Sequence, residues 1–99
     1  MNTAAATRPV RVVLADDHDL VRSGIKALLS MIKDVQVIAE ARNGQELITL
    51  TEELMPDVVM TDISMPGMDG IAAIAHLDMS CPQVKLLVLS MYDTVDFVK

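Results

Sequence analysis

The chain has 99 residues, of which 52% are apolar and 22% charged, so it is long enough for one folded domain and too apolar to be disordered. Its formal net charge of −6 disfavours nucleic acid or an anionic membrane as a partner of this segment. Cys81 is the single cysteine, which excludes a disulfide framework, and no signal-type apolar core is present at the start, so we expect a cytoplasmic location. No apolar run reaches the roughly 20 residues that a membrane-spanning helix needs.

Short apolar runs alternate with helical patterns along the chain. Residues 1–9 are short and polar and are interpreted as a flexible leader, and residues 10–99 as one domain. We expect strands at 10–15, 35–39, 57–61 and 84–89, and helices at 20–32, 45–54 and 71–79. Asp19 is expected to cap the first helix, Pro56 to end the second, and Thr94 to cap a further helix.

The alternation predicts an α/β fold. Nearly continuous apolar strands with helices between them are typical of a parallel sheet that is covered on both faces. Right-handed crossover connections then lead to a doubly wound sheet. Ligands of such sheets bind beyond the carboxyl ends of the strands, so residues that directly follow the strands are the first candidates for function.

Polar side chains, three of them acidic, occupy these positions. Asp16 and Asp17 follow the first predicted strand, Asp62 follows the third, and Ser90 follows the fourth. Three carboxylates at one edge repel one another unless a cation neutralises them. Mg²⁺ prefers oxygen ligands, so we expect Asp17 and Asp62 to bind it directly and Asp16 to hold a metal-bound water. The backbone carbonyl of Ser64 is placed to supply another ligand.

Other interpretations of these residues stay open. An Asp-Asp pair after a strand is also typical of a solvated turn or helix cap. His18 reads as an exposed loop residue rather than a ligand, because imidazole suits softer metals than Mg²⁺. An aspartate carboxylate can attack phosphorus and form an aspartyl phosphate, and a bound metal would offset the charge of both groups.

Three motifs together resemble the receiver domain of two-component response regulators. They are Leu-Ala-Asp-Asp-His at residues 14–18, the block from Asp57 to Gly70 that contains Met-Thr-Asp-Ile-Ser-Met-Pro-Gly, and Leu-Val-Leu-Ser-Met-Tyr at residues 87–92. The first and third motifs are similar to the NarL/FixJ (LuxR-type) subfamily. The resemblance covers the chain from Val10 to Lys99 and implies a flavodoxin-like sheet with strand order 2-1-3-4.

The resemblance implies a role for each matching position. Asp62 matches the phosphoacceptor, Asp16 and Asp17 the acidic Mg²⁺-binding pair, Ser64 the residue that gives its backbone carbonyl to the metal, and Ser90 the switch hydroxyl. A sensor histidine kinase is then the implied phosphoryl donor. The domain would catalyse its own phosphorylation and dephosphorylation as a signalling switch, and not act as a metabolic enzyme. Members of this subfamily usually bind DNA through a C-terminal helix-turn-helix domain.

The sequence departs from the family pattern near its end. A full receiver continues through a fourth helix, a fifth strand and a fifth helix, and a lysine at the end of that strand contacts the phosphoryl group. Lys85 and Lys99 both lie too early to be this lysine. We therefore expect an incomplete domain in which residues 84–89 form an exposed sheet edge. An apolar edge predicts self-association through this strand, and receiver dimerisation is a second route.

Two other functions are weighed against the receiver. A non-signalling form would keep the acidic pocket but work only through protein contacts, because it lacks the lysine. A haloacid-dehalogenase-like phosphohydrolase would also use an aspartyl phosphate. Those enzymes need a second aspartate two residues after the nucleophile, and that position holds Ser64 here.

Overall fold

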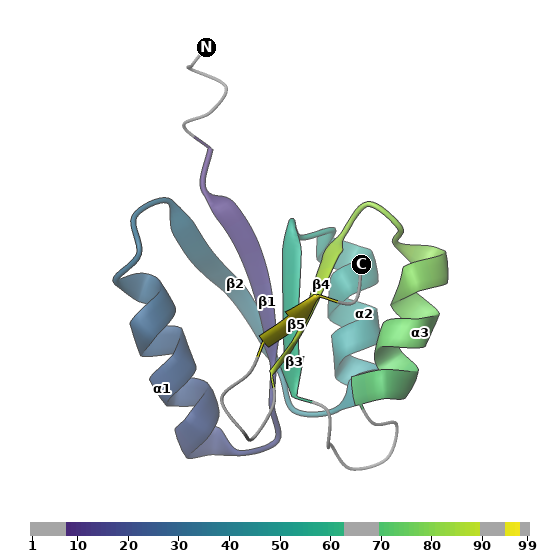
Figure 1. Cartoon of the computed structure of the whole chain (residues 1–99), viewed down its shortest axis with the longest axis horizontal. Helices are drawn as coiled ribbons and strands as arrows, with labels where there is room; N and C mark the ends of the chain where they lie inside the picture. The colour runs from purple at the N-terminus through teal and green to yellow at the C-terminus, as the bar shows by residue number, and fades with distance from the viewer. Residues whose placement is uncertain (1–7, 63–69, 90–94, 98–99) are drawn as a thin grey trace.

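A computed structural model describes residues 8–62, 70–89 and 95–97 of the chain. The elements, in chain order, are β1 (Val10–Ala15), α1 (Asp19–Ser30), β2 (Val35–Ala41), α2 (Gly44–Leu54), β3 (Val58–Asp62), α3 (Gly70–Ser80), β4 (Lys85–Leu89) and β5 (Val95–Phe97). Figure 1 shows α1 on one side of the sheet and α2 and α3 on the other. The predicted α/β class and the seven predicted elements are confirmed.

The sheet has the strand order β2-β1-β3-β4-β5. The pairs β1·β2, β1·β3 and β3·β4 are all parallel, which confirms the predicted doubly wound order 2-1-3-4. Each of the first four strands carries buried or half-buried side chains along most of its length, which explains their continuous apolar pattern.

The last strand corrects two predictions. Val95–Phe97 forms a strand that pairs antiparallel with β4, where we expected the start of a helix; Thr94 itself lies outside the described residues. Only residues 90–94 separate the two strands, and a parallel neighbour would need a crossover of about a dozen residues. β5 also covers the edge of β4 that we expected to be exposed, so self-association through that edge is not supported.

The helix ends differ from the predictions by one or two residues, for local reasons. His18 rather than Asp19 is the N-cap of α1, and Asp19 lies in the first turn, where its charge favours the helix dipole. Asn43 caps α2 by accepting a hydrogen bond from the Glu46 N–H at 2.9 Å. Met55 ends α2 with φ 46° because the proline that follows disfavours a right-handed helical conformation.

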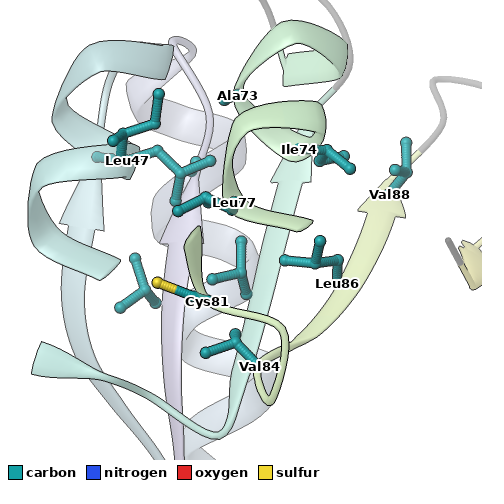
Figure 2. Packing of buried hydrophobic residues seen from close by; sticks show 13 residues of the cluster. Leu47, Ala73, Ile74, Leu77, Cys81, Val84, Leu86 and Val88 are labelled. Carbon is teal, nitrogen blue, oxygen red and sulfur yellow. The ribbon is translucent and has the colours of Figure 1, made fainter. Parts of the chain in front are cut away.

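The hydrophobic core lies between the sheet and the α2–α3 layer. Figure 2 shows Leu47, Leu77 and Leu86, which come from three different elements, within this cluster, and all three are fully buried. On the opposite side of the sheet, which α1 covers, apolar side chains are on the whole buried less completely. Several large apolar side chains of α1 and its C-terminal turn are exposed: Leu20, Val21, Leu28, Met31 and Ile32. Among the described residues, no helix is long and apolar enough to cross a membrane.

Candidate metal centre

The carboxyl ends of β1 and β3 bring the predicted acidic residues together. Ala15 pairs with Thr61 in parallel register, so the residues that follow them lie side by side. Ligand atoms of Asp16, Asp17, His18 and Asp62 all lie within 4.8 Å of one another. The structure therefore confirms that the three carboxylates converge, although Asp62 is the last residue of its strand instead of following it.

Burial distinguishes the three carboxylates. Asp16 and Asp62 are 3% and 5% exposed, whereas Asp17 is open to solvent. Burial of like charges at this distance is costly unless positive charge or hydrogen-bond donors compensate. The site therefore favours a cation.

Asp16 is held by main-chain hydrogen bonds. Its N–H donates to the Ala41 carbonyl at 3.0 Å, which ties the end of β1 to the end of β2. Its Oδ1 accepts the His18 N–H at 2.7 Å, which closes an Asx turn at the start of α1. One oxygen of this carboxylate is thus engaged in shaping the turn, which is consistent with Asp16 holding a metal-bound water.

The His18 ring lies among the carboxylates. Its Nδ1 is 2.8 Å from Asp16 Oδ1, 3.1 Å from Asp17 Oδ1 and 3.9 Å from Asp62 Oδ2. The hydrogen bond to Asp16 raises the pKa of His18, and the charge of Asp17 raises it further. The sequence interpretation as an exposed residue is confirmed, since more than half of the side chain is accessible, but the ring also contacts the acidic cluster.

Ser64 and Ser90, the other predicted site residues, lie outside the described residues, as do Pro66 and Gly67, the Pro-Gly pair of the second motif. Sequence reasoning missed Arg22, whose guanidinium contacts the main chain of Asp16. A signal for it existed. Arg22 shares a helix face with Ile25 and Leu29, the two less exposed aliphatic residues of α1, and an arginine on that face must find polar partners.

Comparison with known proteins places the chain in a family. The model of the response regulator receiver domain matches residues 12–99. The transcriptional regulatory protein DegU of Brevibacillus brevis is 37% identical over 98 residues, which are 99% of this chain and 42% of DegU. This chain therefore spans less than half the length of that relative.

Solved structures agree with this match. The signal receiver domain of the response regulator NarL from Mycobacterium tuberculosis superposes with a TM-score of 0.81 at 37% identity, covering 88% of this chain and 70% of that one. The isolated receiver domain of RcsB from Salmonella enterica serovar Typhimurium, in the presence of the phosphomimetic BeF3−, superposes with a TM-score of 0.79 at 36% identity. The match covers 85% of this chain and 63% of that one. The chain belongs to the response regulator receiver domain family. That family is one of signalling domains and not of metabolic enzymes.

Proposed function

We propose that this chain is a phosphoacceptor receiver in which Asp62 takes a phosphoryl group from the phosphohistidine of a sensor histidine kinase. The observation that carries the proposal is the convergence of three carboxylates from the ends of β1 and β3, two of them buried, within 4.8 Å of one another. A single aspartate at a strand end would be compatible with a solvated turn. The convergence of three carboxylates, two of them buried, supports a site that binds a cation and leaves a carboxylate oxygen available for reaction.

The residues present fit Mg²⁺. Carboxylates are hard oxygen ligands, and the neighbouring carboxylates raise the pKa of the His18 ring that lies among them, as expected for a site that favours positive charge. Asp17 and Asp62 would bind the ion directly, Asp16 through water, and Ser64 through its backbone carbonyl. When bound, Mg²⁺ would neutralise charge on the carboxylates and on the incoming phosphoryl group.

The chemistry at Asp62 is a transfer between two side chains. A carboxylate oxygen of Asp62 forms a bond to phosphorus while the bond from phosphorus to the kinase histidine breaks, and the electron pair returns to the imidazole nitrogen. Hydrolysis of the resulting aspartyl phosphate resets the domain. The hydroxyl of Ser90 would bind the phosphoryl group and bias a two-state change of the surrounding surface.

The wider assignment follows from the family. We infer that the chain is the N-terminal part of a transcriptional regulator that binds DNA through a C-terminal helix-turn-helix domain and works in the cytoplasm. The net charge of −6 argues against DNA binding by this segment itself. Dimerisation of the receiver stays a prediction, and sedimentation of the full chain tests it.

The proposal is tested with acetyl phosphate and with beryllofluoride, each in the presence of Mg²⁺. Intact mass should show a phosphoryl adduct on the wild-type chain and none on Asp62→Asn, and ¹⁹F NMR should show bound beryllofluoride only for the wild type. Asp57→Asn is a matched control, because Asp57 precedes the same strand at the opposite end of the sheet and should leave both signals intact. A chain that binds Mg²⁺ but accepts no phosphoryl group would favour the non-signalling alternative. An unchanged adduct on Asp62→Asn would refute the assignment of Asp62.

A further inference from the structure

A buried arginine lies directly behind the acidic cluster. Arg22 is 8% exposed and is the most deeply buried residue of α1. Burying a guanidinium is unfavourable unless its N–H groups are hydrogen-bonded and its charge is balanced. The hydrogen-bond partners of Arg22 therefore indicate which parts of the structure its guanidinium stabilises.

Three acceptors surround the guanidinium. Nη1 donates to the main-chain carbonyl of Asp16 at 2.7 Å. Nε donates to Glu40 at 3.0 Å, and Nη2 donates to Asp19 at 2.7 Å. The group thus joins the end of β1, the strand β2 and the first turn of α1 through a rigid, planar set of donors, which the flexible ammonium of a lysine does not reproduce.

The Arg22 N–H donates to the His18 carbonyl at 2.9 Å, which is the first main-chain hydrogen bond of α1 and does not depend on the arginine side chain. The hold of Arg22 itself on the turn at residues 16–18 is the side-chain hydrogen bond to the Asp16 carbonyl. The peptide unit that joins Asp16 to Asp17 is planar, so fixing the direction of the Asp16 carbonyl also fixes the direction in which Asp17 leaves. On the other side, the Asp16 N–H is bound to Ala41.

We propose that Arg22 is a positioning residue for the metal centre. Its guanidinium is anchored by Glu40 and Asp19 and binds the Asp16 carbonyl, which sets the direction of the acidic pair toward Asp62 and thereby the affinity for Mg²⁺. This inference rests on the proposed function, since it concerns the same site. It assigns a role to a residue that touches neither the ion nor the phosphoryl group.

The direction in which the Mg²⁺ affinity changes when Arg22 is replaced distinguishes positioning from a purely electrostatic role. If Arg22 acted only through its positive charge, its removal would leave the site more negative and would strengthen Mg²⁺ binding. If Arg22 positions the carboxylates, its removal should weaken Mg²⁺ binding even though the site has become more negative. Loss of a residue that orients metal ligands typically costs about 10- to 100-fold in affinity.

The experiment is isothermal titration of the full chain with Mg²⁺, together with urea unfolding of each variant. We expect about a tenfold or greater loss of affinity in Arg22→Met. Arg22→Lys keeps the charge but loses the rigid, planar arrangement of donors, so we expect a loss there too. Lys26→Met is the matched control, because Lys26 also binds Glu40, at 2.9 Å, without touching Asp16, and its affinity should stay within about twofold of the wild type.

The outcomes are distinguishable. Weaker binding in the folded Arg22 variants, with Lys26→Met unchanged, supports positioning; if Arg22→Met does not fold, Arg22→Lys carries the test. Unchanged or tighter binding in the folded Arg22 variants overturns the inference and leaves the proposed function standing. A wild-type chain that binds no Mg²⁺ overturns the proposed function together with the inference.

Discussion

The two ends of β3 each carry an aspartate, and the surroundings of the two carboxylates are opposite. Asp57, just before the strand, accepts hydrogen bonds from Arg8 at 2.8 and 3.1 Å and from the Arg11 N–H at 2.8 Å. Asp62, the last residue of the strand, lies within 4.8 Å of ligand atoms of the acidic turn at 16–18. Asp57 is bound by the donors of two arginines, whereas Asp62 lies beside two further carboxylates and the His18 ring.

The difference shows that the partners of an aspartate decide its role. The guanidinium of Arg8 lowers the pKa of Asp57, and the hydrogen bond from Arg11 lowers it further, so this carboxylate stabilises the fold as an anion. At the opposite end, like charges meet and a cation would be needed to relieve them. The following experiments test whether the two ends behave as oppositely as their contacts indicate.

The largest effect is expected from Asp57→Ala. The change removes the acceptor of the Arg11 N–H and both contacts of Arg8, and loss of such a partner costs about 2 kcal/mol. The free energy of unfolding in urea should fall by that amount. Asp57→Asn is the control, because it keeps one oxygen for the Arg11 N–H and should lose less; equal losses would show that this hydrogen bond is unimportant.

The free energy of unfolding is expected to change in the opposite direction for Asp62→Asn. Without metal, the change removes one of three crowded charges, so the free energy of unfolding in EDTA should rise by about 1 kcal/mol. Adding Mg²⁺ should stabilise the wild type by mass action and the variant less. A variant that is less stable than the wild type in EDTA would show that the cluster is not electrostatically strained.

A smaller effect is expected from Arg8→Gln. Arg8 is largely exposed, so solvent and salt screen its pairing with Asp57. The urea midpoint should fall slightly at low ionic strength, and the difference from the wild type should disappear in about 1 M NaCl. A difference that persists at high salt would indicate packing of the Arg8 side chain instead.

The smallest effect on stability is expected when the pH is lowered. The folded-state pKa of Asp57 lies below its ordinary value of 3.8, so the stabilisation is complete above that value and is lost as the pH falls below it. The urea midpoints of the wild type and of Asp57→Asn should therefore begin to converge as the pH is lowered from about 5 to about 3. A constant difference over that range would contradict the assigned role of Asp57.

Much of the fold was predictable because the signals are local. The apolar runs at residues 10–15 and 84–89 are long enough to specify buried strands wherever they pair, and parallel pairing then places Asp16 and Asp62 at one edge. The partner of residues 95–97 was not predictable in this way. A run of three residues is too short for its hydrophobic periodicity to distinguish a short antiparallel strand from the start of a helix.

The sequence by itself determined the parallel sheet, the convergence of the acidic pair with Asp62, and the family, since all three depend on short motifs and strand periodicity. Only the tertiary structure decided which charges are neutralised. Arg8 reaches Asp57 across 49 positions and Arg22 reaches Glu40 across 18, and such pairings depend on the packing of distant elements. For that reason the sequence placed aspartates at both ends of β3, and the folded chain gave them different partners.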